Sequence, residues 1–224
     1  MQDINNAGQE YPMQPSVFQC WRKETGSPST SAWIITSKDK LEVLSDCSNS
    51  LWKGQYRPSY NCGISGKGTG NREDTATWNT AKKILEQYHP KLVMLHFKEP
   101  DISGHNGNWQ GYLDGIRSSD SLLYELWKFL QQDSIYSGKT TLFVSNDHGR
   151  HLDPVKDGYV SHGDSCEGCR HINCFAAGPD FKKNVLLDSK HCQQDIPATI
   201  ATMMGFQLPV SEGKAMEELF IDLK

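Results

Sequence analysis

At 224 residues the chain fits one α/β domain spanning residues 1–224, because domains of up to about 250 residues commonly fold around a single core. Its residues are 37% apolar and 22% charged, an ordinary globular mixture, and no apolar run reaches the roughly 18 residues of a transmembrane segment. The net charge of -4 argues against a nucleic-acid-binding surface, which needs clustered Lys and Arg to displace counterions.

The amino terminus, MQDINNAGQEYPMQPSV, has neither the basic start nor the apolar stretch of a secretory signal peptide. Localisation is therefore unknown, and export is expected only if an upstream segment is missing. The seven cysteines are odd in number and widely spread, which does not match the dense disulfide framework of a small secreted scaffold. The cysteine pattern does not distinguish an oxidising from a reducing compartment.

The first third of the chain predicts one helix, one strand and a long loop. Residues 15–25 carry apolar side chains at helical spacing and stop at Gly26, and residues 32–36 form a short β-branched run suited to a buried strand. Residues 46–72 are rich in Ser, Asn, Gly and Pro and are expected to form a long surface excursion. Its aromatic residues either line a substrate pocket or pin the loop to the core: Trp52, Tyr56 and Tyr60.

Strands and helices alternate along the rest of the chain. The helical spacings and apolar runs predict helices over 75–89, 109–130 and 195–205, and strands over 92–97, 140–146 and 172–178. This alternation is typical of right-handed βαβ crossovers, so we expect a three-layer α/β/α fold with a mostly parallel sheet. In such open sheets, ligands bind beyond the carboxyl ends of the strands.

Metal-ligand side chains follow the predicted strands. Asp101 and His105 come after residues 92–97, Asp147 and His148 come after residues 140–146, and SHGD places His162 before the next strand. Imidazole nitrogen and carboxylate oxygen are ligands that Zn²⁺ prefers in catalytic sites. Two Asp/His pairs and a further His suggest two ions, which together can promote the in-line displacement of ester hydrolysis.

Each pair also has a simpler interpretation. Asp101 could cap the helix that begins near Asn106, and Asp147 could close a turn before Gly149. Joint placement favours the metal site, because charged groups at buried strand ends are costly unless they are paired or bind an ion.

At these residues the sequence resembles the alkaline phosphatase superfamily, which includes nucleotide pyrophosphatases/phosphodiesterases, sulfatases and cofactor-independent phosphoglycerate mutases. EPDISGH resembles the loop that supplies an Asp and a His to one metal, and NDHGR resembles the loop that supplies an Asp and a His to the other. HGDSCEGCRHINCFAAGPD resembles the segment whose His returns to the first metal. The match is good over about residues 75–210, where DIPATIATMMGFQLP resembles the closing helix and turn.

The resemblance implies a metal-dependent hydrolase of small phosphate or sulfate esters. It assigns Asp101, His105 and His162 to one metal, with His171 as the alternative to His162, and Asp147 and His148 to the other. An intact member binds two divalent ions, and zinc or manganese suits these ligands. Because the second ion would keep only two ligands here, we expect weak binding there and one well-held ion in this chain.

The chain departs from the family before residue 75. Family members open with an apolar strand that ends in a metal-binding Asp, followed by a Ser, Thr or modified Cys nucleophile. Neither feature is identifiable here, because Asp3 follows no strand and no such strand precedes Ser29, Thr30 or Cys47. We therefore expect an amino-terminally truncated fold that lacks its first strand and has impaired activity; the alternative is a noncatalytic remnant that serves as a binding or structural module.

Two further features have competing interpretations. Cys166, Cys169, His171 and Cys174 suggest a structural zinc loop, although a disulfide between Cys166 and Cys169 or free thiols are alternatives. Arg150 either contacts a substrate oxyanion, for which the guanidinium geometry is suited, or forms a surface salt bridge.

Overall fold

A computed structural model describes residues 6–209 and 211–221, which divide into two compact units. Unit 1 takes in the described residues up to Lys98 together with Ala201–Ser211, and unit 2 takes in Glu99–Ile200 and the described residues from Glu212 on. Among the described helices, none is both long and apolar enough to cross a membrane.

A parallel three-stranded sheet forms the centre of unit 1. Strand β1 (Ala32–Thr36) lies between β2 (Ser59–Cys62) and β3 (Leu92–His96), with Trp33 opposite Ser59 and Ala32 opposite Leu92. The side chains of Ile34 and Ile35 are fully buried, as expected for a central strand covered on both faces.

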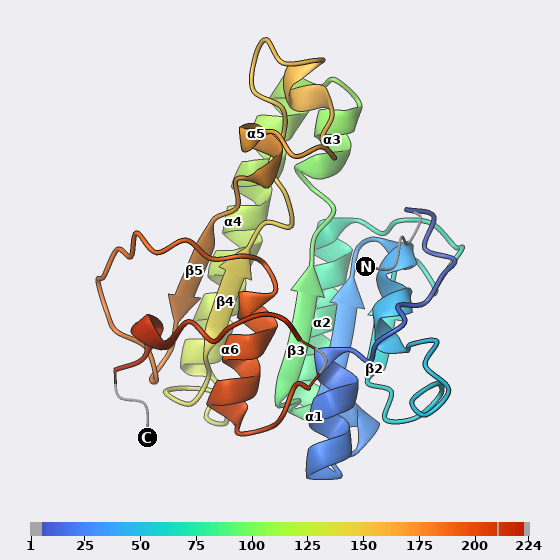
Figure 1. Cartoon of the computed structure of the whole chain (residues 1–224), viewed down its shortest axis with the longest axis vertical. Coiled ribbons are helices and arrows are strands. Elements are labelled where there is room, and N and C mark those ends of the chain that lie inside the picture. Colours follow the sequence, from blue (N-terminus) through green and yellow to red (C-terminus); the bar gives the residue numbers. More distant parts are fainter. Residues whose placement is uncertain (1–5, 210, 222–224) are drawn as a thin grey trace. The chain divides into compact units, whose positions relative to one another are not determined.

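Two helices flank this sheet, α1 (Val17–Thr25) and α2 (Asp74–Tyr88), and Figure 1 shows α1 in front of the strands and α2 behind them. Helix α1 begins at a capping box, in which Ser16 and Gln19 bond each other's backbone N–H, and it ends at Gly26 with φ 64°. Helix α2 buries its apolar face through Trp78, Ala81 and Leu85.

The interval 46–72 contains a strand, which the sequence analysis did not predict there. Strand β2 is the edge strand of the parallel sheet. The preceding loop is fixed by Gln19, which is fully buried and donates hydrogen bonds to Asp46 and to the carbonyls of Trp52 and Gln55. Before this interval, the short 3₁₀ helices η1 (Ser29–Ser31) and η2 (Asp39–Ser45) lie on either side of β1 in the sequence.

Unit 2 contains a second, antiparallel ladder formed by β4 (Leu142–Ser145) and β5 (Cys174–Ala177). Its helices are the one-turn α3 (Asp101–His105), the long α4 (Trp109–Gln132), the short α5 (Glu167–Arg170), and the first part of α6 (Asp195–Met204). Two 3₁₀ helices, η3 (Gly158–Val160) and η4 (Glu217–Leu219), lie in its loops.

The expected α/β class with a parallel sheet is confirmed by β1, β2 and β3. The expectation that residues 172–178 continue a parallel alternation is wrong, because Leu142 pairs with Ala177 and Ser145 with Cys174 in antiparallel register. A short helix and loops, in place of a full crossover helix, connect β4 to β5, and they let the chain return in the opposite direction. The proposals of a single domain and of an absent first strand stay predictions.

A buried carboxylate ties the ends of two parallel strands together in unit 1. Asp74 is only 7% exposed, and it accepts hydrogen bonds from the Ser37 hydroxyl at 2.5 Å and from the Lys98 backbone N–H at 2.8 Å. The same hydroxyl lies 2.8 Å from the Thr77 hydroxyl. Ser37 directly follows β1 and Lys98 shortly follows β3, so this network fixes both strand exits.

Replacing this carboxylate should destabilise unit 1. We expect Asp74→Ala to lower the free energy of unfolding by about 1–3 kcal/mol, because it leaves buried donors without an acceptor. The matched control is Glu73→Ala, which removes an exposed partner of Lys98 and should cost less than about 1 kcal/mol. Urea denaturation followed by tryptophan fluorescence measures both changes, and equal losses in the two variants would contradict the role given to Asp74.

A histidine in unit 2 joins the start of α6 to the segment near η4. His191 lies 3.2 Å from Asp195 through Nδ1 and 2.5 Å from Glu218 through Nε2. Burial alone would lower the pKa of His191, but the hydrogen bonds to Glu218 and Asp195 outweigh it and raise that pKa. The pKa of Glu218 is lowered by its own backbone N–H and by His191.

These shifts predict a pH window for the contribution of His191 to stability. A raised folded-state pKa stabilises the protein below the unfolded value of about 6.5, and this stabilisation disappears as the pH rises through the folded-state pKa. We expect His191→Gln to cost up to about 1 kcal/mol near pH 6 and much less near pH 9. Urea midpoints at the two pH values test this, and a larger loss at the alkaline pH would refute it.

Candidate metal centre

Helix α3 presents an aspartate and a histidine on the same side. Asp101 and His105 are four residues apart, which places their side chains on one face of the single helical turn. Nε2 of His105 lies 3.3 Å from Oδ1 of Asp101. The Asp101 side chain is 18% exposed and the His105 side chain is 45% exposed, so the pair lies at the edge of the protein interior.

The loop after β4 supplies the second predicted pair, Asp147 and His148. Nδ1 of His148 lies 3.0 Å from the carbonyl oxygen of Gly149, and this contact turns Nε2 toward Asp101 at 3.9 Å. The Asn146 side chain donates to the His148 carbonyl at 3.0 Å and braces the loop. Asp147 is more exposed, and its Oδ1 lies 3.6 Å from Nε2 of His148.

His162 completes the group from the segment that follows η3. Its Nε2 lies 3.6 Å from Oδ1 of Asp101 and 3.1 Å from Nε2 of His105, and its ring stacks on that of His148 with centroids 3.5 Å apart. Nε2 atoms of three histidines therefore surround one carboxylate oxygen.

The environment of His162 favours a neutral ring. Burial, and after it the neighbouring His148, lower the pKa of His162 to about 4. A ring with this pKa is neutral at pH 7 and offers a nitrogen lone pair. Ligand atoms of Asp101, His148 and His162 all lie within 4.8 Å of one another.

Arg150 holds Asp101 in position through hydrogen bonds. One of its terminal nitrogens donates to the Asp101 carboxylate and, at 2.8 Å, to the Asp101 carbonyl; the other donates to the carbonyls of Tyr159 and Val160. The Arg150 residue is 9% exposed. Contact with a substrate oxyanion stays a prediction, because both terminal nitrogens bind protein atoms.

The structure separates the alternative residues from this group. Among the described residues, His171 belongs to neither of the two clusters with metal-ligand spacing. Cys166 and Cys169 gather with His151 and Asp164, and not with His171 and Cys174 as the zinc-loop hypothesis supposed. His151 and Asp164 were not assigned as ligands from the sequence, although they lie inside the NDHGRH and SHGD segments that carry predicted ligands.

An aromatic group lies close to Arg150. The rings of Trp109 and Tyr112 stack with centroids 5.5 Å apart, and Tyr159 meets both edge-on. The Arg150 guanidinium lies 5.8 Å from the centre of the Tyr112 ring, and the Tyr159 hydroxyl donates to the Gly107 carbonyl at 2.8 Å. These rings hold η3 against α3 and the start of α4.

The close approach of Arg150 to α3 requires a glycine. A Cβ added at Gly104 would lie 2.6 Å from the central carbon of the guanidinium, which its hydrogen bonds prevent from withdrawing. We expect Gly104→Ala to cost about 1–3 kcal/mol and to displace Asp101. Thermal denaturation against Asn106→Ala, an exposed change at the end of the same helix, provides the comparison. Identical melting of wild type and Gly104→Ala would show that the guanidinium is not fixed.

Comparison with known proteins places this chain in a family. A phosphopentomutase from Herpetosiphon aurantiacus is 24% identical over 148 residues, which make up 66% of this chain and 34% of the relative. The chain thus spans about a third of the length of the curated relative that it matches. A family model described as the Metalloenzyme superfamily matches residues 30–208, well over half of the chain and all of the candidate metal ligands. This chain belongs to the Metalloenzyme superfamily.

Proposed function

We propose that Asp101, His105, Asp147, His148 and His162 form the metal centre of an enzyme that transfers or hydrolyses phosphoryl groups of small phosphate esters. The observation that carries this proposal is the convergence of Nε2 from His105, His148 and His162 on Oδ1 of Asp101, at 3.3–3.9 Å. Membership of a metalloenzyme family and the similarity to a phosphopentomutase support it.

The spacing of these donors fits a divalent transition-metal ion. Ligands about 2.0–2.2 Å from a tetrahedral ion lie about 3.3–3.6 Å from one another. The three histidine Nε2 atoms lie 3.3–3.9 Å from Oδ1 of Asp101, and Nε2 of His105 lies 3.1 Å from Nε2 of His162, so these separations bracket this range. Neutral imidazoles and a carboxylate suit zinc and manganese, so these are the ions we propose.

The five ligands can serve one ion or two. Asp101, His148 and His162 lie close enough together to share one ion, with His105 beside them. Asp147 approaches the group only through His148, and its side chain is 59% exposed. We propose that one ion is held tightly on the Asp101 side and that a second ion, on the Asp147 side, binds weakly.

A bound divalent ion polarises a phosphoryl oxygen and stabilises the charge that develops during in-line displacement. The protein residues set up this chemistry by their positions. Arg150 holds the Asp101 carboxylate in one orientation, while the Gly149 carbonyl directs Nε2 of His148 inward. Such partners beyond the ligands fix ligand geometry and typically change metal affinity about 10–100-fold when they are removed.

Hydrolysis of phosphate or sulfate esters is our proposed reaction, and a mutase reaction is the second candidate. The matched relative is named a phosphopentomutase, which favours phosphoryl movement on a phosphorylated sugar. The two reactions differ in the acceptor of the phosphoryl group, which is water in one and a substrate hydroxyl in the other. Product analysis with aryl phosphate, phosphodiester, aryl sulfate and pentose phosphate substrates separates them. Hydrolysis releases phosphate, a phosphate monoester or sulfate according to the ester, whereas a mutase isomerises the pentose phosphate without releasing phosphate.

Metal titration tests the centre directly. We expect isothermal titration with Mn²⁺, which thiolate ligands disfavour, to show that His162→Ala weakens the tightest Mn²⁺ site by more than the roughly 100-fold change that removal of a residue beyond the ligands can cause. The matched control is His171→Ala, which alters the competing histidine of the same segment and should leave this affinity within about twofold of wild type. Loss of binding in the His171 variant alone would overturn the assignment.

Activity measured on the same samples distinguishes a catalytic protein from a noncatalytic remnant of the fold. Metal-dependent turnover that falls with His162→Ala and survives His171→Ala is expected for the catalytic proposal. Tight metal binding without turnover of any tested ester would support the noncatalytic module in its place.

A further inference from the structure

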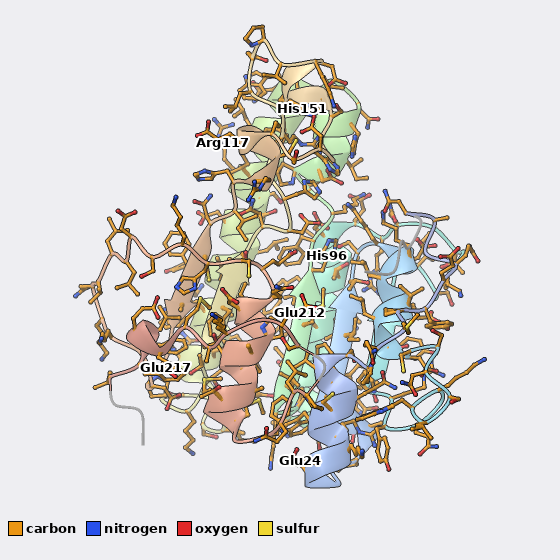
Figure 2. The ribbon with its side chains drawn as sticks, in the orientation of Figure 1. Glu24, His96, Arg117, His151, Glu212 and Glu217 are labelled. Atoms are coloured by element: carbon orange, nitrogen blue, oxygen red, sulfur yellow. The ribbon has the colours of Figure 1, made fainter. Side chains whose placement is uncertain are left out.

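Unit 2 contains a second cluster of metal-ligand side chains. Its chemistry differs from that of the Asp101 group, by which we mean Asp101, His105, Asp147, His148 and His162. His151, Asp164, Cys166 and Cys169 each offer one ligand atom, and these atoms all lie within 4.8 Å of one another. Figure 2 labels His151 in the loops near α3 and α5. Two thiol sulfurs, one imidazole nitrogen and one carboxylate oxygen make a complete set of four donors.

His151 is oriented as a metal-binding histidine. Its side chain is 2% exposed, and its Nδ1 lies 3.0 Å from the Ser161 hydroxyl and 3.3 Å from Asp157. Nε2 is buried and has no hydrogen-bond partner among the described residues, and it points into the cluster, 3.2 Å from Asp164 Oδ2. Metal-ligating histidines commonly use one ring nitrogen for a carboxylate or hydroxyl and leave the other for the ion.

The cysteines are held on the same side by a short backbone turn. Cys166 precedes α5 and its sulfur accepts a hydrogen bond from the Cys169 N–H at 3.4 Å, while Asp164 accepts one from the Cys166 N–H at 3.0 Å. Backbone N–H bonds of this kind orient both side chains before an ion binds. The ammonium of Lys156 lies 2.6 Å from Asp164 and offsets part of the negative charge of two thiolates and a carboxylate.

The segment of residues 151–170 has almost no apolar core, so its fold depends on another stabilising interaction. Among residues 151–170, the buried positions are His151, Gly158, Gly168 and Cys169, whereas the side chains of Leu152 and Val155 are 54% and 41% exposed. The secondary structure of this segment is limited to the short η3 and the single turn of α5, which bury little apolar surface. The donors of the cluster therefore occupy the place that aliphatic side chains usually fill.

We propose that His151, Asp164, Cys166 and Cys169 bind a structural Zn²⁺ ion. Four protein donors close the tetrahedral coordination sphere, which is the pattern of a structural rather than a catalytic zinc site. Soft thiolate ligands also select zinc over magnesium, calcium or manganese. The ion joins the segment after β4 to the segment around α5, and it thereby fixes the loop that carries Arg150 and His162.

Contacts between the two segments agree with this role. The Gly149 N–H donates to the Cys169 carbonyl at 2.9 Å, and the His151 N–H donates to the Ser161 carbonyl at 3.3 Å. A Cβ added at Gly168 would lie 2.2 Å from the Arg150 carbonyl oxygen, so the two backbones are in direct contact. An ion bound at the cluster would thus affect the candidate metal centre only by fixing the positions of its residues.

Cobalt substitution tests the proposal without relying on activity. The full chain is purified under reducing conditions, stripped of metal with a chelator and titrated with Co²⁺. Thiolate ligands give a charge-transfer band in the near ultraviolet, which the histidines and carboxylates of the Asp101 group cannot produce. We expect this band to saturate at about one Co²⁺ per chain and to disappear when an equivalent of Zn²⁺ is added.

Cysteine variants identify the ligands. Cys166→Ser and Cys169→Ser should each remove at least half of the band, whereas Cys174→Ser, the matched control on an exposed cysteine of β5, should leave it unchanged. Alkylation mapped by mass spectrometry provides a measurement on the unmutated protein, in which Zn²⁺ should slow the modification of Cys166 and Cys169 but not of Cys174.

Three results would overturn the proposal. One is the absence of a thiolate band in the reduced full chain. Another is its loss in Cys174→Ser with retention in Cys166→Ser, which would restore the zinc loop built on His171 and Cys174. The third is a Cys166–Cys169 disulfide that persists in protein prepared without oxygen, because a disulfide leaves no thiolate for the ion.

Discussion

The candidate metal centre depends on how one carboxylate is held. Asp101 receives the Arg150 guanidinium on one side and faces three imidazole nitrogens on the other. The Asp101 side chain is only 18% exposed, and its ion pair with Arg150 offsets part of the cost of burying a charge there. Burial and the neighbouring His148 lower the pKa of His162, so this ring keeps a free nitrogen lone pair. The geometry therefore keeps this lone pair for an ion.

Close backbone contact makes this arrangement possible. Gly104 leaves room for the Arg150 guanidinium against α3, and Gly149 and Gly168 let the two loops touch. At each position a side chain would fall within 2.6 Å of a neighbouring atom. These glycines are not needed for a left-handed backbone conformation. They are needed because the site is built from loops that pack against one another without intervening side chains.

Much of the fold was predictable from the sequence, for identifiable physical reasons. Apolar runs located β1, β3 and β4, and helical periodicity located α2 and α4. Strand β2 was missed because it is a four-residue edge strand with polar and exposed positions, so no apolar run marks it. The ladder direction of β5 could not be predicted, since pairing direction depends on how the connecting loops fold and not on the apolar pattern of the strand.

Local spacing and loop folding also explain which donor residues could be grouped from the sequence and which could not. Asp101 and His105 are four residues apart on a helix, so their proximity follows from the sequence. The role of His151 could not be predicted, because side chains three residues apart on an irregular loop can point in different directions. His148 faces the Asp101 group and His151 faces the thiols, so one short loop serves two donor sets. Nitrogen and oxygen donors accept several divalent ions, whereas thiolates favour zinc. On the two proposals together, the loop can therefore be fixed by zinc while the neighbouring centre remains free to use another metal.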